Sequence, residues 1–229
     1  MKFLASLFIT LLISTSVLVA QEKTVERPDP QNPVGGNLEV PTNWEVRLDK
    51  PDADVTIGKD AESSDIFFVN MKPGWHITTG PRAIFYPSKN MASGTYKVHS
   101  KIHLFDPKGR NEAFGVFMGG QNLQKENQTY TYFLLRNSGE YLIKKRVGAE
   151  TKLVKDWTKT DAMVVYDDTT NSAVANTLSV EVMENDVAFF VNGTKVDTLP
   201  KEGLDTSGIV GLRVNHALNL HVEDFGVEM

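Results

Sequence analysis

Apolar and polar side chains alternate along most of the chain after residue 43. In residues 94–105, for example, Val98 and Ile102 occupy one side of the alternation, and Lys97 and Lys101 occupy the other. Successive side chains of a β-strand point to opposite faces, so a period of two predicts a half-buried strand. The same pattern recurs in residues 129–136, 141–146, 177–183, 187–191 and 208–225.

Turn signals separate these alternating segments. A glycine at 139 lies between two of them, and the pair Asn192-Gly193 lies between two others. Asn-Gly between apolar alternations is the strongest short-range signal for a hairpin, because both residues tolerate positive φ. No segment after residue 43 has sustained helical periodicity. The sequence therefore predicts an all-β domain over residues 44–229, a two-sheet sandwich or a barrel.

The first 43 residues have a different composition. Residues 1–20 hold Lys2, a long apolar run and Ala20, which is typical of a secretory signal peptide. An uncleaved membrane anchor is the alternative interpretation. Residues 21–43 are polar and contain four prolines and two glycines, which indicates a linker or extended arm. We therefore expect a protein secreted to the periplasm or beyond the cell, with no membrane span after cleavage.

Composition narrows the chemistry. The chain has no cysteine, so it has no disulfide framework and no thiolate metal site. Its formal net charge of −5 argues against nucleic acid as a partner.

Several motifs, in their order along the chain, are similar to the concanavalin A-like lectin/glucanase superfamily. More narrowly, the chain resembles secreted bacterial glucanase-like domains grouped with laminin-G-like modules and named after 3-keto-disaccharide hydrolases. The motifs are Gly74-Trp-His-Ile-Thr, Ser93-Gly-Thr-Tyr, Tyr132-Phe-Leu, Gly139-Glu-Tyr-Leu-Ile-Lys, Trp157-Thr, Asn176-Thr-Leu-Ser-Val, Phe190-Val-Asn-Gly and Gly208-Ile-Val-Gly-Leu. The resemblance implies a jelly-roll sandwich of two antiparallel sheets, with ligands on the concave sheet or at its rim.

One motif of the superfamily is missing. Its laminarinase-type members carry Glu-x-Asp-x-x-Glu on a strand, which brings a nucleophile and an acid/base about 5 Å apart for retaining hydrolysis. The nearest match here runs from Glu184 through Asp186 to Phe189, where the closing carboxylate is absent. We do not assign that mechanism, and no catalytic residue is predicted.

Polar and aromatic residues on predicted strands supply the candidate ligand-binding positions. Aromatic rings stack on sugar faces, and arginine, lysine, asparagine and histidine side chains can bond hydroxyls or a carboxylate. On the predicted faces, Arg213 and Asn215 lie opposite the core of their sheet. Each position also has a structural interpretation, as core, charged strand edge or turn. The candidates are Trp75, His76, Tyr132, Arg136, Lys144, Arg213, Asn215 and His216.

The resemblance and these residues together favour a secreted jelly-roll module that binds glycan, with an oligosaccharide or polysaccharide as partner. Two alternatives stay open: a glycoside hydrolase that uses another set of residues, and a structural or protein-interaction module. The resemblance also allows a structural calcium held by loop oxygens, although no loop has a recognised ligand spacing. No other cofactor and no other metal site is assigned.

Overall fold

The computed structural model describes residues 38–51, 54–169 and 172–229. The expected signal peptide (residues 1–20) and most of the expected linker lie outside the described residues. Within the described ranges the chain forms strands and turns and no helix. Those ranges accordingly contain no helix long and apolar enough to cross a membrane.

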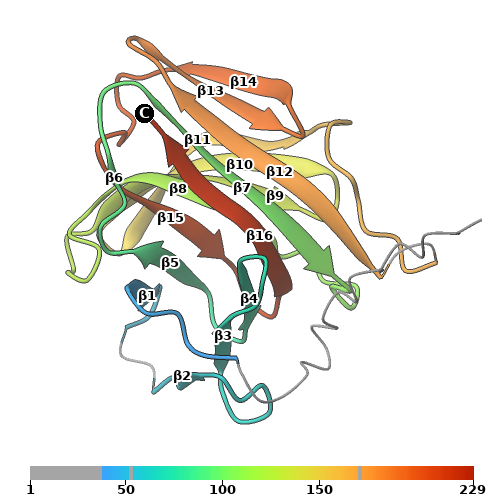
Figure 1. The fold of residues 1–229 in the computed structure, drawn as a ribbon. Helices are drawn as coiled ribbons and strands as arrows, with labels where there is room; N and C mark the ends of the chain where they lie inside the picture. Colours follow the sequence, from blue (N-terminus) through green and yellow to red (C-terminus); the bar gives the residue numbers. More distant parts are fainter. Residues whose placement is uncertain (1–37, 52–53, 170–171) are drawn as a thin grey trace, which may run out of the picture.

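The strands form two sheets that pack face to face, which confirms the predicted jelly-roll sandwich (Figure 1). All neighbouring strands are antiparallel except β2 and β3. Sheet A has the order β1 (Trp44–Leu48), β5 (Ala83–Pro87), β15 (Gly208–Val214), β8 (Ala113–Gln121), β9 (Thr129–Arg136), β10 (Glu140–Val147) and β11 (Glu150–Lys159), with β6 (Met91–Ala92) paired to β15. Sheet B has the order β14 (Thr194–Pro200), β13 (Asp186–Val191), β12 (Ala173–Val182), β7 (Tyr96–Phe105), β16 (Asn219–Glu228), β4 (Trp75–Thr79), β3 (Ile66–Asn70) and β2 (Ile57–Gly58).

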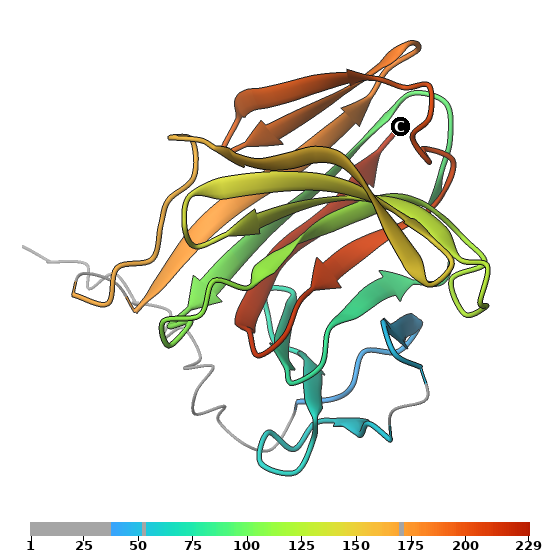
Figure 2. The same cartoon turned by 180° about the vertical axis from the view of Figure 1, so that it is seen from behind.

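The main hydrophobic core lies between the two sheets. In Figure 1 strands β12, β7 and β16 of sheet B lie in front, and Figure 2 shows the strands of sheet A from the opposite side. Large apolar side chains from both sheets are fully buried between them, including Phe85, Phe133, Leu178, Phe189 and Leu212. Burial of this apolar area is the main force that holds the two layers together.

The local predictions on strands and turns are confirmed where they were most specific. Burial in β7 alternates residue by residue, as the sequence period requires. Gly139 has a φ of 76°, and Asn192 and Gly193 have φ values of 49° and 79°. The two turns therefore use the left-handed backbone for which these residues are suited.

The turn between β15 and β16 does not use its asparagines for the left-handed backbone. The left-handed residue is Ala217, with a φ of 49°. Asn219 is instead the first residue of β16, and its side-chain oxygen accepts a hydrogen bond from Thr78. Tertiary contacts thus decide the conformation here over the preference of asparagine for turns.

Sheet A is buried on its outer face as well as its inner face. A second apolar cluster covers the outer face, so strands β8 and β9 are buried at nearly every position. This cluster closes over a group of polar side chains, which is described in the next section. Its members are Ile84, Tyr86, Ala113, Phe117, Leu123, Tyr130, Tyr132 and Leu134, with Trp157 and Ile209 packed against them.

The outer face of sheet B carries a row of histidines. The rings of His76 on β4 and His103 on β7 lie 6.3 Å and 5.8 Å from the ring of His221 on β16. His103 contacts the carboxylate of Glu223, so charged pairs partly cover this face. His76 itself is completely buried.

Burial of His76 predicts an acid-sensitive contribution to stability. The pKa of His76 is lowered from 6.5 to about 4, mainly by burial. A hydrogen bond with Asn219 raises this pKa in part, and the nearby His221 lowers it. As pH falls from 6.5 toward 4, the unfolded chain takes up a proton that the folded chain does not. The free energy of unfolding should therefore fall by up to about 3 kcal/mol between pH 6.5 and pH 4 because of His76 alone. Above pH 6.5 both states are neutral and the effect vanishes.

The test compares urea unfolding of the native chain and of His76→Gln at pH values from 4 to 7. The variant should show a shallower fall in the free energy of unfolding toward pH 4, whatever its stability at pH 7. Parallel curves for the two proteins would contradict the assignment.

Candidate functional site

A cavity of about 280 Å³ opens on the outer face of sheet A. It crosses the sheet from the end of β1 to β11, so residues far apart in the sequence meet around it. Its lining residues are Asp49, Arg82, Tyr132, Leu134, Leu142, Lys144, Arg146, Ala149, Thr151, Trp157, Arg213 and Asn215.

A buried ion pair forms one wall of the cavity. Arg213 on β15 donates from Nη1 and Nη2 to the two carboxylate oxygens of Asp49, at 2.9 and 2.7 Å. The Arg213 side chain is 4% exposed and that of Asp49 is 13% exposed. A planar guanidinium matches a carboxylate in this two-bond geometry, which offsets the desolvation of both charges.

Two tyrosines of β9 hold the other side of Arg213. Its Nη1 also donates to the hydroxyl of Tyr130 at 2.9 Å, and its guanidinium carbon lies 4.8 Å from the centre of the Tyr132 ring. Strand β8 runs between β15 and β9, and the β8 residue opposite Arg213 is Gly115. A Cβ at Gly115 would lie 2.1 Å from the carbonyl oxygen of Phe133, so this position of β8 accepts only glycine. Arg213 reaches past it to Tyr130 on β9. Burial raises the pKa of both tyrosines, so both stay neutral.

Two further arginines lie near Asp49. Arg146 approaches one carboxylate oxygen at 3.7 Å, and Arg82 approaches the other at 3.9 Å. Burial alone would raise the pKa of Asp49, but Arg213, Arg146 and Arg82 together lower it below its ordinary value. Asp49 is therefore a carboxylate that stays ionised, and not one poised to donate a proton.

The hairpin of β10 and its neighbour β11 form the opposite wall. Lys144 and Arg146 are direct cross-strand partners of Tyr132 and Tyr130. Trp157 on β11 lines the same wall, and the Arg136 guanidinium lies 4.0 Å from the centre of its ring. Arg136 is held in turn by Glu140, at 2.7 Å. Arg136 thus supports the tryptophan from outside the cavity.

Polar atoms in this cavity are incompletely satisfied. The Nε atoms of Arg146 and Arg213 and the side-chain oxygen of Asn215 are buried and have no hydrogen-bond partner among the described residues. Buried polar groups are normally paired, so three unpaired ones beside one cavity make it the candidate site for a polar ligand.

The sequence candidates divide into three groups in space. Four of them line the cavity: Tyr132, Lys144, Arg213 and Asn215. Two lie next to it, because Arg136 contacts Trp157 and the Nε2 atom of His216 accepts a hydrogen bond from Arg82 at 2.7 Å. Two lie elsewhere: Trp75 packs on Trp44 with ring centres 4.8 Å apart, and His76 is buried on the outer face of sheet B.

Sequence reasoning missed the other charged and aromatic residues of the cavity, namely Asp49, Arg82, Arg146 and Trp157. Asp49 and Arg82 lie just beyond strand ends, where no periodic pattern marks them. Arg146 ends the predicted strand of residues 141–146 but was not among the candidates, and Trp157 entered only through the family resemblance. Trp157 is preceded on β11 by a run of exposed residues, so the strand itself had no apolar alternation to reveal it.

The described residues offer no group of three or more histidine, aspartate or glutamate side chains arranged to hold a metal ion. The carboxylate of Asp167, in the loop before β12, accepts hydrogen bonds from the backbone and the side chain of Thr169.

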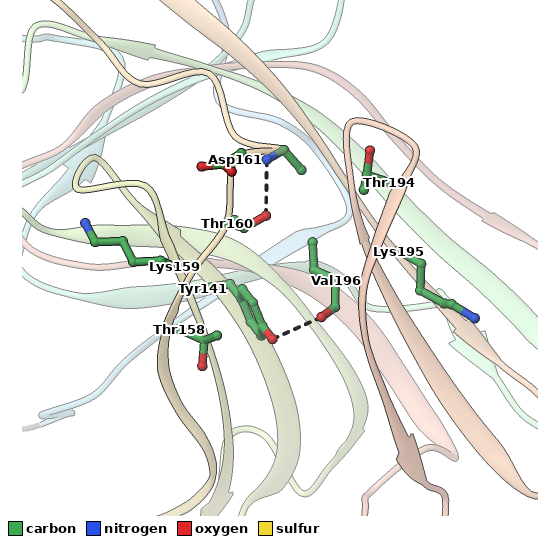
Figure 3. A pocket seen from close by; sticks show the side chains of 9 residues that line it. Tyr141, Thr158, Lys159, Thr160, Asp161, Thr194, Lys195 and Val196 are labelled. Carbon is green, nitrogen blue, oxygen red and sulfur yellow. Dashed lines mark hydrogen bonds between the residues drawn. The ribbon is translucent and has the colours of Figure 1, made fainter.

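A second cavity, of about 490 Å³, lies where the end of β11 and the following loop approach β14 (Figure 3). Figure 3 shows the Tyr141 hydroxyl directed to the carbonyl oxygen of Val196, to which it donates at 3.0 Å. The side chains of Lys159 and Lys195 extend to opposite sides of this view. Among the described residues, no buried polar side-chain atom without a partner lines this second cavity. The first cavity is therefore the stronger candidate site.

The Asp49–Arg213 pair predicts a large stability effect. Asp49→Asn leaves the buried Arg213 charge without compensation, so the free energy of unfolding should fall by about 3–5 kcal/mol. The measurement is urea unfolding at pH 7. The matched control is Asp224→Asn, which removes an exposed carboxylate that pairs with His99 and should cost less than about 1 kcal/mol. Equal effects of the two substitutions would contradict the importance of the buried pair.

Comparisons with known proteins agree on the fold. No model of a known protein family matches the sequence, and neither does any curated protein. Among solved structures, the carbohydrate binding module CBM66 from Bacillus subtilis has a TM-score of 0.57 and 12% identity, covering 86% of this chain and 100% of its own. A glycoside hydrolase family 16 endo-glucanase from Bacteroides ovatus has a TM-score of 0.54 and 10% identity, covering 80% of this chain and 94% of its own.

A third similar structure is a Bacillus subtilis protein of unknown function with a galectin-like fold. Its TM-score is 0.51 at 9% identity, and the match covers 81% of this chain and 89% of that one. Identities this low describe architecture alone. The chain has the jelly-roll fold of concanavalin A-like lectins and glucanases.

Proposed function

We propose that this protein binds carbohydrate in the cavity bounded by Asp49, Arg213 and Trp157. The observation that carries the proposal is the composition of that cavity, in which aromatic rings and unpaired buried polar atoms line one concave space. Sugars present C–H faces to aromatic rings and hydroxyls to charged and amide groups. The fold is compatible with this role, because a carbohydrate binding module is among its structural neighbours.

The size of the cavity limits the ligand. Pockets for small molecules enclose about 300–1,000 Å³, and this one is near the lower bound. It would accept one or two sugar rings and not a long section of polysaccharide. We infer that it recognises a terminal unit or a short oligosaccharide.

The charges favour binding over hydrolysis. Glycoside hydrolysis ordinarily uses two carboxyl groups, one of which must act as an acid. Among the described residues that line the cavity, Asp49 is the carboxylate, and three arginines hold it ionised. An ionised aspartate in a two-bond pair with arginine is suited to accepting hydrogen bonds from sugar hydroxyls.

The N-terminal sequence supports export of this module. Residues 1–20 have the charge, apolar run and small residue of a signal peptide, and carbohydrate outside the cytoplasm would then be its target.

A panel of oligosaccharides tests the proposal, with binding followed by calorimetry and any released product by chromatography. The native chain should bind at least one class without releasing product. Trp157→Ala should weaken that binding about tenfold or more, since it removes the stacking surface. Leu153→Ala is the matched control, because it truncates an exposed residue of the same strand that does not line the cavity.

Three outcomes would overturn the proposal. Failure of the whole panel to bind would remove its basis. Binding that is insensitive to Trp157→Ala would place the ligand elsewhere. Product release that is lost in Trp157→Ala would make the protein a hydrolase.

A further inference from the structure

Positive charge is concentrated in the cavity. Four cationic side chains line it, namely Arg82, Lys144, Arg146 and Arg213, against the carboxylate of Asp49. The chain as a whole has a formal net charge of −5, so the cavity is opposite in sign to the protein around it. A small, partly enclosed space with excess positive charge attracts anionic ligands.

Asp49 lies much closer to Arg213 than to the other cationic side chains of the cavity. Arg213 occupies both of its oxygens at 2.7 and 2.9 Å, whereas Arg146 reaches it only at 3.7 Å. Arg146 is 7% exposed, and its Nη2 donates a long hydrogen bond to the backbone oxygen of Asp49 at 3.4 Å. Its Nε atom has no partner among the described residues. Lys144 lines the cavity, and its side chain forms no hydrogen bond or ion pair within the described part of the chain. Two cations on β10 are therefore available to a ligand.

The strand register brings these two cations to one wall. Lys144 and Arg146 are two positions apart on β10, so their side chains leave the same face, about 7 Å apart at the backbone. The aromatic residues Tyr132 and Trp157 line the same cavity. A ligand with an anionic group and a ring of sugar size could contact the cations and the aromatic rings at once.

We propose that the sugar recognised in this cavity carries a carboxylate, so that the ligand is a uronic acid or an oligosaccharide that contains one. This inference rests on the proposed carbohydrate binding. The carboxylate contacts Lys144 and Arg146, and the sugar ring lies toward Trp157. Asp49 and Asn215 accept hydrogen bonds from ring hydroxyls.

A sulfated sugar would share the anionic chemistry, and the geometry favours the carboxylate. The Nε–H of a guanidinium and its neighbouring N–H form a planar fork that matches the two oxygens of a carboxylate. A tetrahedral sulfate ester is bulkier in a cavity of about 280 Å³ that must also hold the ring.

Matched pairs of oligosaccharides test this inference. Oligomers of galacturonic, glucuronic and mannuronic acid are compared with the same oligomers after reduction of the carboxyl groups to alcohols, and with 6-sulfated neutral oligomers. At least one uronic acid oligomer should bind the native chain about tenfold or more tightly than its reduced partner, and this preference should weaken as salt is added.

Substitutions locate the preference. The preference is the affinity for the uronic acid oligomer divided by the affinity for its carboxyl-reduced partner. Lys144→Gln should lower this ratio about tenfold. Lys152→Gln is the matched control, because it removes the same charge from the neighbouring strand on the opposite face, and it should keep the ratio. Thermal unfolding of both variants checks that each is folded.

The outcomes separate this inference from the proposed function. Equal affinity for acidic and reduced oligomers would overturn the uronic acid assignment and leave carbohydrate binding intact. Tighter binding of sulfated oligomers would overturn the choice of carboxylate. An acidic preference that survives Lys144→Gln would overturn the placement of the carboxylate. No binding of any acidic, reduced or sulfated oligomer would count against both proposals.

Discussion

The ion pair between Asp49 and Arg213 is the interaction on which the outer face of sheet A depends. It joins residues 164 positions apart in the sequence and ties the end of β1 to β15. Two charges that are this deeply buried are tolerated only when they are paired and hydrogen-bonded. Arg213 donates two hydrogen bonds to the carboxylate of Asp49 and a further one to the hydroxyl of Tyr130. The pair fixes Arg213 in one orientation, whereas the Nε atom of Arg146 and the ammonium group of Lys144 keep unused donors for a ligand.

The same pair explains how a buried sheet can carry a binding site. A sandwich needs only one face of each sheet to be apolar, but sheet A is covered on both faces. On its outer face the apolar cover surrounds a polar cavity that the aromatic residues partly enclose. Electrostatic interactions are stronger in such a space than in open water. The fold supplies the rigid platform, and the residues placed on it determine the chemistry.

The sequence predicted the architecture better than the site. Period-two alternation and the Asn192-Gly193 turn depend on local chemistry, so they could be recognised without coordinates. The two faces of β9 were also predictable, because Tyr132 and Phe133 are adjacent residues of a strand and their side chains point to opposite faces. By contrast, β11 is an edge strand with mostly exposed side chains, and it has no apolar pattern to reveal it.

The site residues differ in the same way. Arg213, Asn215, Tyr132 and Lys144 lie on recognisable strands, so sequence reasoning could select them, although it could not show that they meet. Asp49 could not be selected, because its role comes from long-range pairing across the sheet. Trp75 and His76 could not be assigned to a face until the register of β4 was known.

The central claim is that carbohydrate occupies the cavity beside Arg213, and the indole N–H signals of the three tryptophans test it most directly. Trp157 lines the cavity, whereas Trp44 and Trp75 pack on each other at the edge of the core. In a nuclear magnetic resonance titration with the tightest-binding oligosaccharide, the Trp157 signal should shift and the other two should stay. Shifts of Trp44 or Trp75 with a constant Trp157 signal would place the ligand elsewhere and contradict the account.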